Sequence, residues 1–281
     1  MKRSAFTLLE LLVVIVLIAL LAALLIPAIN KSRETARRTQ CLFRQRDLAM
    51  ALITYDKEKN GLPGCLNQLG DTPLHSWVVA IFPMIGENKR YEVLMKGPFP
   101  DEALVSPPVL LCPSDNSEDK GRLNYVVNCG PAAIEHGDVV PTFTLFKDRR
   151  SALTAINKKV KIDEIPDGAS STILLSENVS KSVDAKDVWH ADWLNTRYAP
   201  NEFMNTRSAN VVKELGFIWS PQSDFAPNSS VSGPRPSSKH PATVIAAYAD
   251  GSAKPINDDI AIEDWLKAVC PDDKKLEELV R

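Results

Sequence analysis

The sequence shows little imbalance of charge and no series of hydrophobic spans. Its 281 residues include 33 Lys and Arg against 35 Asp and Glu, which gives a net charge of −2. Nucleic-acid-binding surfaces carry a clear basic excess, so this balance argues against a nucleic acid as partner. The mean hydropathy of −0.12 excludes a protein with several membrane spans.

The sequence also lacks the motifs of common enzymes. It contains no G-x-S-x-G, no H-E-x-x-H and no nucleotide-binding loop. In the segment Trp189–Trp193, His190 and Asp192 could share a metal ion on one face of a strand, but the flanking tryptophans favour a packed edge. We therefore expect no enzymatic activity, and an anchored hydrolase is the weakest alternative.

Cysteines are few and scattered. The five are Cys41, Cys65, Cys112, Cys129 and Cys270. They form no C-x-x-C pair and have no zinc-binding spacing, so we predict no metal site. In an oxidising compartment they could form two disulfide bonds and leave one thiol, with Cys41 and Cys112 as the preferred pair. Alternatively, all five pack as buried thiols.

What the sequence does contain is one apolar segment near its N-terminus. Every residue from Leu11 to Ile26 is apolar, and Glu10 is the only charge between Ala5 and Ile29. A helix of this length nearly crosses a hydrocarbon core of about 30 Å. The segment is too long for a secretory signal, and no clear cleavage site follows it. A plain membrane anchor leaves Glu10 unexplained unless its carboxylate reaches the interface, because a buried carboxylate is costly and usually functional.

The start of the chain, Lys2-Arg3-Ser4-Ala5-Phe6-Thr7-Leu8-Leu9-Glu10, resembles the signal of type IV prepilins and type II secretion pseudopilins. The resemblance implies that prepilin peptidase cleaves between Ala5 and Phe6 and that Phe6 is N-methylated. It also implies that Glu10 guides assembly with other pilin or pseudopilin subunits. The family usually has Gly where this chain has Ala5.

The same resemblance implies a single-pass protein of the inner membrane with an extracytoplasmic domain. The distribution of basic residues alone favours the opposite orientation. Two basic residues precede the apolar segment, whereas six follow it: Lys31, Arg33, Arg37, Arg38, Arg44 and Arg46. We follow the prepilin signal, because its peptidase acts at the cytoplasmic face.

The helix is predicted to continue beyond the membrane to about Lys59. Cys41, Leu48, Leu52 and Tyr55 recur at helical spacing on one face, and Asn60-Gly61 supplies a stop signal. Pro27 either bends this helix or marks its end at the membrane surface. We predict a leader (1–5), an N-terminal helix (6–59, with 6–29 in the membrane or filament core) and one globular domain (60–281).

The globular domain is predicted to hold short strands and one C-terminal helix. The predicted strands are Val109–Cys112, Asn124–Asn128, Thr142–Phe146, Thr172–Ser176 and Gly216–Trp219. Asp250-Gly251 predicts a β-hairpin within Thr243–Ile256, Gln222–Lys239 an exposed loop, and Ile260–Val269 a helix. The expected fold is α+β and pilin-like, with a long helix against an antiparallel sheet.

His240, followed after nine residues by Asp250-Gly251, is similar to the signature of a bacterial group of prepilin-like proteins with a domain of unknown function. Other stretches also resemble that group: Glu34–Cys41, Leu111–Asp115 with Asn124-Tyr125, and Ile165–Thr172 leading to Ser176-Glu177-Asn178. The resemblance covers almost the whole chain but indicates architecture more than activity. From the residues alone we expect His240 to order the hairpin and Asp250 to form its turn.

Pseudopilins often bind calcium through a C-terminal loop, and Asn257, Asp258, Asp259 and Asp264 are the available oxygen ligands in this chain. Their spacing is not that of an EF-hand, so we expect no cofactor and favour a helix N-cap before Ile260, with calcium as a minor alternative. The predicted function is a structural subunit of a type IV pilus-like or type II secretion filament. The alternative is a membrane-anchored extracytoplasmic binding module that does not polymerise.

Overall fold

The fold was obtained as a computed structural model. It describes residues 8–64, 66–68, 74–96, 105–115, 122–135, 138–141, 160–178, 191–192, 216–219 and 236–272. The predicted strand Thr142–Phe146, most of the predicted loop 222–239, and His190 lie outside these residues. Asp192 lies at the end of the short strand β7 (Ala191–Asp192), which pairs with β3 (Arg122–Leu123).

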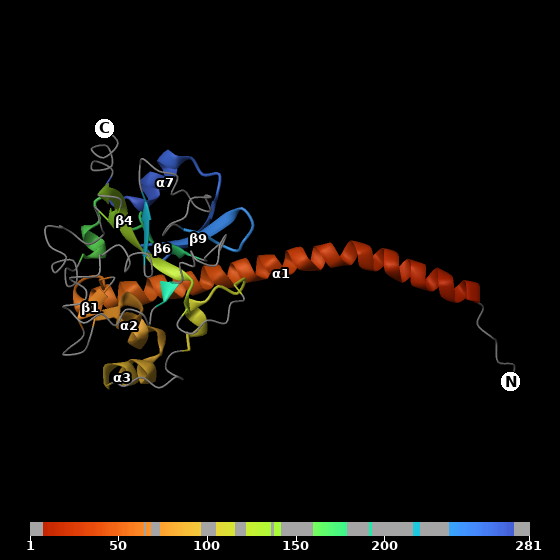
Figure 1. The fold of residues 1–281 in the computed structure, drawn as a ribbon, viewed down its shortest axis with the longest axis horizontal. Coiled ribbons are helices and arrows are strands. Elements are labelled where there is room, and N and C mark those ends of the chain that lie inside the picture. Colours follow the sequence, from red (N-terminus) through yellow and green to blue (C-terminus); the bar gives the residue numbers. More distant parts are fainter. Residues whose placement is uncertain are drawn as a thin grey trace.

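The dominant element is α1 (Leu8–Lys59), one helix of 52 residues that projects from the rest of the molecule (Figure 1). Pro27 lies inside α1, so of the two roles considered for it, marking the end of the helix is wrong. The predicted stop is confirmed: Asn60 adopts a left-handed φ of 58°, and the amide of Gly61 donates to the carbonyl of Asp56 at 2.9 Å.

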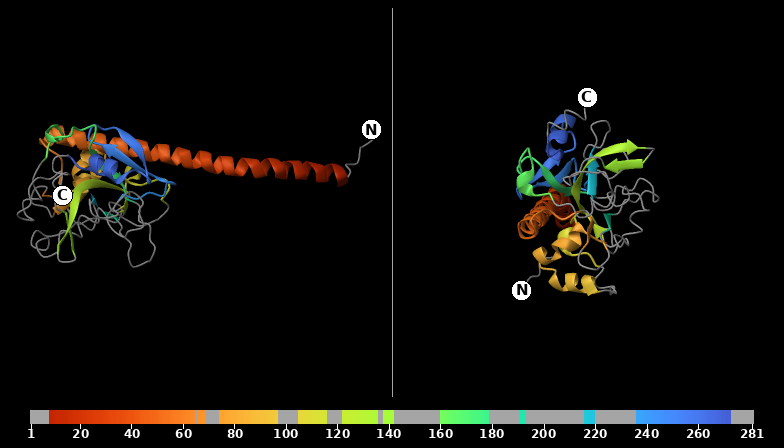
Figure 2. Two further views of the ribbon diagram at one scale, coloured as in Figure 1. Left: turned by 90° about the horizontal axis from the view of Figure 1, so that it is seen from above. Right: turned by 90° about the vertical axis from the view of Figure 1, so that its left-hand side faces the viewer.

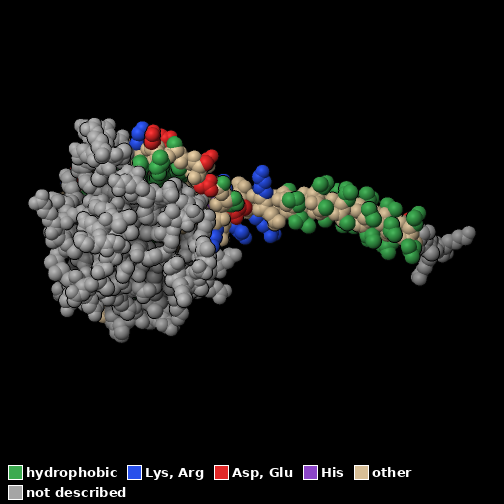
Figure 3. All heavy atoms as spheres, turned by 45° about the horizontal axis from the view of Figure 1, so that its top comes forward, with side chains coloured by type: hydrophobic (Ala, Val, Ile, Leu, Met, Phe, Trp, Pro, Cys, Tyr) green, Lys and Arg blue, Asp and Glu red, His purple; other side chains and the backbone are tan. Residues whose placement is uncertain are grey.

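The two halves of α1 have different surroundings. Its large apolar side chains from Leu8 to Ile29 are exposed, and this half is long and apolar enough to cross a membrane. Figure 3 shows these side chains covering the part of the rod farthest from the domain, with charged side chains nearer the domain. In the second half, all four residues of the predicted packing face, from Cys41 to Tyr55, are buried. The sequence pattern therefore predicted this interface correctly.

The main sheet has the strand order β10-β9-β6-β4-β5, with each neighbouring pair antiparallel. Its strands are β4 (Tyr125–Glu135), β5 (Asp138–Pro141), β6 (Ile173–Glu177), β9 (Thr243–Tyr248) and β10 (Ala253–Asn257). A further strand, β8 (Gly216–Trp219), pairs in parallel with β4. The predicted α+β pilin-like fold is thus confirmed.

Short helices complete the described part of the domain. These are α2 (Trp77–Ile81), η1 (Phe82–Ile85), α3 (Asn88–Lys96), η3 (Pro108–Leu110), η4 (Ile162–Glu164) and α7 (Ile262–Val269). A small pair of strands, β1 (Leu66–Gln68) and β2 (Leu74–Ser76), precedes α2. The predicted strand Val109–Cys112 is wrong, because Pro107 and Pro108 start a 3-10 turn instead.

The core forms around the second half of α1. The helix contacts β9, β10 and β6, and also η1 and α2. The sheet lies on one side of α1 and the short helices α2 and α3 on the other (Figures 1 and 2). Trp77 and Phe82 are fully buried in this core, and α7 adds Trp265 from beside β6. Burial of several such aromatic and aliphatic side chains stabilises the domain around α1.

The predicted hairpin joins β9 to β10, and its turn packs onto α1. Gly251 has a φ of 85°, whereas Asp250 does not adopt a positive φ. The predicted hairpin is confirmed, and of its two turn residues Gly251 alone uses the left-handed region, because a three-residue loop needs that region only at its last position. A Cβ on Gly251 would lie 2.7 Å from Sδ of Met50 and 3.2 Å from Cδ1 of Ile53.

We predict that Gly251→Ala destabilises the domain by about 2–3 kcal/mol, since the added methyl group must displace the flexible side chain of Met50 and press on Ile53, in addition to the cost of a positive φ. Gly86→Ala is the matched control: Gly86 has a φ of 80°, but no atom lies within 4 Å of its added Cβ. The control should cost only about 1–2 kcal/mol. Thermal unfolding of the full chain in detergent measures both, and equal losses would show that the hairpin tip does not pack on α1.

Candidate functional site

The residues predicted to direct processing lie at the exposed end of α1. Ala5 and Phe6 are outside the described residues, so cleavage between them stays a prediction. Glu10 lies in the first turn of α1 and is the only acidic residue within its apolar half. None of the described elements of the domain covers this half of the helix, and its most apolar stretch contains no buried residue.

Two residues of the motif, His240 and Gly251, hold β9 against α1, while Asp250 forms the turn as predicted, with Oδ1 accepting from the amide of Ser252 at 2.8 Å. His240 lies just before β9 and contacts Glu34 of α1, while Gly251 follows β9 and lies against Met50. Between them, Nε2 of Gln45 donates to the carbonyl of Ile245 at 2.7 Å. Strand and helix therefore run in the same direction. Nine residues separate His240 from Asp250. They contain the six residues of β9, which span about 20 Å, so the two ends of the motif reach two separate points along α1.

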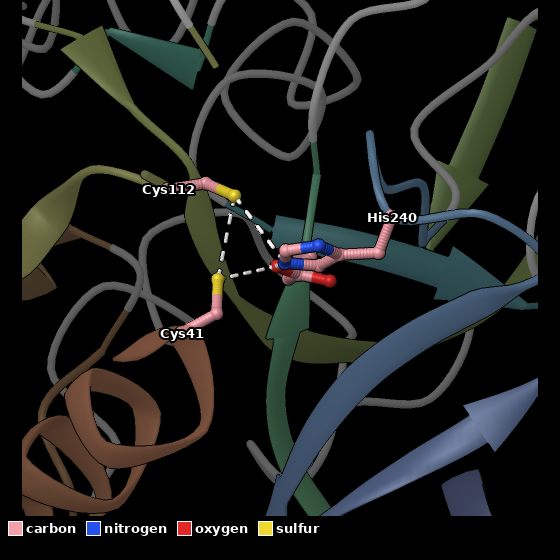
Figure 4. Close-up of side chains that lie close together, drawn as sticks. Cys41, Cys112 and His240 are labelled. Atoms are coloured by element: carbon pink, nitrogen blue, oxygen red, sulfur yellow. Dashed lines mark hydrogen bonds and ion pairs between the residues drawn. The ribbon is translucent and has the colours of Figure 1, made fainter. Parts of the chain in front are cut away.

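Around His240, side chains from four separate segments form a buried cluster: Cys41 of α1, Cys112 after η3, Glu177 at the end of β6, and His240. These four residues are exposed by 0–2% only. Sγ of Cys41 lies 3.4 Å from Sγ of Cys112 and 2.6 Å from Oε1 of Glu177. Nε2 of His240 lies 3.7 Å from Sγ of Cys112 and 3.5 Å from Oε1 of Glu177 (Figure 4). We call these four residues the buried cluster.

A second layer of hydrogen bonds orients the cluster. Nδ1 of His240 lies 2.5 Å from Oε1 of Glu34, whose carboxylate also accepts from the hydroxyl of Ser114. The other oxygen of Glu177, Oε2, accepts from the backbone amide of Ile245 at 2.9 Å. His240 is therefore oriented by a residue of α1, and Glu177 by a residue of β9.

The loop that carries Cys112 is held by Asn124, which lies between β3 and β4. Oδ1 of Asn124 accepts from the amide of Cys112 at 2.7 Å, and Nδ2 donates to Asp115 at 2.8 Å. The neighbouring Tyr125 donates its hydroxyl to the carbonyl of Leu111 at 3.0 Å and lies 2.9 Å from Sγ of Cys41. The Asn124-Tyr125 pair thus determines where Cys112 faces Cys41.

Burial and mutual contacts shift the titration of the cluster. Burial raises the pKa of Cys41, and the hydrogen bond from Cys41 lowers the pKa of Cys112 to about 7. Burial alone would lower the pKa of His240. Hydrogen bonds to Cys112, Glu177 and Glu34 and the charge of Glu177 outweigh this effect, and the pKa rises to about 10. The cluster is therefore an environment that favours a positive charge on His240.

The sequence indicated only part of this cluster. Cys41 and Cys112 were the preferred disulfide pair, and the structure brings their sulfur atoms together but leaves both as free thiols. His240 was expected to order the hairpin, which it does through its contacts with α1. Glu177 and Glu34 were not singled out as site residues, although both lie in stretches that resemble the prepilin-like group. These resembling stretches marked the residues, but no rule of sequence spacing predicts that four segments so far apart in the chain meet.

The proposed oxygen ligands for calcium are spread over β10, the turn that follows it and α7, where Asp264 lies in the first turn. Asn257 ends β10, and Asp258 and Asp259 form the following turn. The predicted N-cap is wrong, because α7 begins at Ile262 with Ala261 as its cap residue and no side-chain capping bond. In the part of the chain that the structure describes, the one group of three or more clustered His, Cys, Asp or Glu ligands is the buried cluster. It was not foreseen, since no metal site was predicted.

We predict that Asn124→Ala destabilises the domain by about 1–3 kcal/mol, because it leaves the buried amide of Cys112 without an acceptor. Asn257→Ala is the matched control, since Asn257 is exposed at the end of β10 and should change stability by less than about 0.5 kcal/mol. Thermal unfolding measures the difference. A loss for Asn124→Ala no larger than that of the control would contradict the orienting role of Asn124.

Comparisons with known families match both the start of the chain and its globular domain. The profile of the prokaryotic N-terminal methylation motif matches residues 1–26, and that of the family described as protein of unknown function (DUF1559) matches residues 30–263. No curated protein and no solved structure matches the chain significantly. The methylation motif implies processing by prepilin peptidase and association with a membrane. With most of its length matched, the chain belongs to the DUF1559 family and is a prepilin-like precursor with an N-terminal methylation motif.

Proposed function

We propose that the chain is a structural subunit of a type IV pilus-like or type II secretion filament. The observation that carries this proposal is the division of α1 into an exposed apolar half and a half that forms the core of the domain. An exposed apolar rod must be covered by lipid or by other apolar helices. The methylation motif at its start is typical of precursors whose helices are first held in a membrane.

Glu10 supports assembly rather than simple anchoring. A carboxylate within an apolar helix costs about 2.5–3.5 kcal/mol on insertion scales, so its presence requires a compensating interaction. Cleavage after Ala5 would create a free α-amine on Phe6, four residues before Glu10. In a bundle of such helices, the amine of one subunit can pair with Glu10 of its neighbour. This pairing removes the cost of burying either charge alone.

The basic residues that follow the apolar half are compatible with an extracytoplasmic domain. Arg38 donates to the carbonyl of Pro241 at 3.1 Å, and Arg44 to the carbonyl of Leu111 at 2.6 Å. Arg37 lies 3.7 Å from Glu34. Arg38 and Arg44 attach α1 to the domain, and Arg37 pairs within α1, so the number of basic residues need not reflect a cytoplasmic location. This supports the inner-membrane orientation that the prepilin signal implies.

The proposed role is structural rather than catalytic. The buried cluster holds the chemically most versatile side chains that the structure describes, yet its four residues are at most 2% exposed. A substrate would have no access to them in this conformation. The cluster instead joins α1 to three segments of the domain, as expected of a stabilising element.

The proposed function first predicts that the chain is cleaved between Ala5 and Phe6. When the full chain is co-expressed with a prepilin peptidase, mass spectrometry of the purified protein should show the loss of residues 1–5 and one methyl group on Phe6. Ala5→Gly should be processed at least as completely, because Gly is the residue that the prepilin family usually has there. Ala5→Leu should block cleavage. An intact leader in the wild-type chain beside an active peptidase would contradict the proposal.

The second prediction concerns assembly. Glu10→Ala should abolish filaments seen by electron microscopy of cells that make the chain and its assembly machinery, because the incoming amine of Phe6 loses its partner. Glu10→Gln should also fail, since it keeps the shape but not the charge. Asp47→Ala, an exposed carboxylate on the second half of α1, is the control and should form filaments. Normal filaments from both Glu10 variants would contradict the proposed pairing, whereas a processed wild-type chain that never polymerises would favour a membrane-anchored binding module.

A further inference from the structure

We propose that the buried cluster binds one Zn²⁺ ion, with Cys41 Sγ, Cys112 Sγ, Glu177 Oε1 and His240 Nε2 as its four ligands. The ion would join α1 to three separate segments of the domain. This site is independent of whether the chain polymerises, because its ligands all lie in the second half of α1 and in the globular domain.

The donor atoms have the spacing of a tetrahedral site. All four lie within 4.8 Å of one another. Zinc bond lengths of about 2.0–2.3 Å at tetrahedral angles place neighbouring ligand atoms about 3.3–3.8 Å apart. The Cys41–Cys112, Cys112–His240 and His240–Glu177 separations are 3.4, 3.7 and 3.5 Å. The 2.6 Å separation of Cys41 from Glu177 must lengthen to admit the ion. The remaining pairs, Cys41–His240 and Cys112–Glu177, lie within the 4.8 Å that bounds the group.

The two nitrogen atoms of His240 have the surroundings of a metal-bound imidazole. Nδ1 lies 2.5 Å from Oε1 of Glu34, the contact of a nitrogen that donates its proton to a carboxylate. Among the described residues Nε2 has no comparably close partner, and it faces Cys112 Sγ and Glu177 Oε1 at 3.5–3.7 Å. A carboxylate behind a ligating histidine is the usual second shell of a zinc site, because it fixes the tautomer and the ring orientation.

The charges of the cluster also favour a cation. Binding would replace the protons on both thiols and any proton on Nε2 of His240 with one Zn²⁺, and these protons would pass to solvent. The ion would then face two thiolates and the carboxylate of Glu177. Behind them, Arg37 offsets the charge of Glu34, with 3.7 Å between Nη1 and Oε2. Once the thiols have lost their protons, the bound cation is what makes the burial of these negative groups possible.

The donor set selects the metal and the kind of site. Two sulfurs, one imidazole and one carboxylate suit Zn²⁺, whereas calcium and magnesium prefer oxygen ligands. With four protein ligands and almost complete burial, no coordination position is left open for a substrate. A disulfide between Cys41 and Cys112 would use the same sulfur atoms, but it would account for neither the placement of Glu177 nor that of Nε2 of His240.

The test is the metal content of the full chain, purified in detergent with a mild reductant. Elemental analysis should give one zinc per chain, and Cys112→Ser and His240→Gln should each lose it. Cys270→Ser is the matched control, because Cys270 is also a buried cysteine but lies outside the cluster. It should retain the zinc. A wild-type chain with free thiols and no zinc, or one whose zinc survives Cys112→Ser, overturns the proposal.

Two further measurements do not depend on the folding of the ligand variants. Wild-type protein stripped by a chelator should take up one Co²⁺ and show the thiolate charge-transfer and visible bands of a tetrahedral site. Glu34→Gln should weaken zinc binding about 10–100-fold, while Asp47→Asn on the same helix should not change it. Octahedral cobalt without thiolate bands, or unchanged affinity in Glu34→Gln, contradicts the proposed geometry. Loss of two hydrogens from the Cys41 and Cys112 peptides in zinc-free protein prepared without reductant would instead establish a disulfide.

Discussion

The packing of the second half of α1 against β9 is the interaction on which the rest of the structure depends. Three contacts join β9 and its flanking residues to the helix: His240 with Glu34, Ile245 with Gln45, and Gly251 with Met50. The second half of the helix is buried between the sheet and the short helices, and in the part of the chain that the structure describes it shares one hydrophobic core with the domain. This constraint explains why a motif of fixed spacing, from His240 to Asp250-Gly251, accompanies a helix that begins outside the domain.

The same helix connects the domain to the membrane. Its apolar half is exposed up to Ile29, and α1 meets the domain at Glu34, beside the buried cluster. Arg38, Arg44 and Cys41 follow within three turns, each in contact with a different part of the domain. A force on the apolar half would therefore reach the domain first at this junction. In a subunit inserted into or extracted from a bundle of helices, that is where a stabilising link would have the largest effect.

Local patterns made much of this fold predictable. The length of α1, its packing face and the β9–β10 hairpin follow from helical periodicity, a helix stop and an Asp-Gly turn, all of which act between near neighbours. Predictions failed where short-range signals competed. Pro107 and Pro108 started a 3-10 helix that takes in Val109 and Leu110, where a strand was predicted. The helix α7 began two residues later than its acidic residues suggested. The helices α2 and α3 were missed because their apolar residues follow no clear repeat. The cluster could not be predicted, since its four ligands come from segments whose proximity depends on the whole sheet.

The central claim, that α1 is both the membrane segment and the core of the domain, is tested most directly by two truncations. A chain that starts at residue 30 keeps the packing face and should give a soluble, cooperatively unfolding domain. A chain that starts at residue 60 lacks the helix and should show no cooperative unfolding and no dispersed amide spectrum. If residues 60–281 alone fold with the stability of residues 30–281, α1 is only an attached anchor and does not form the core of the domain.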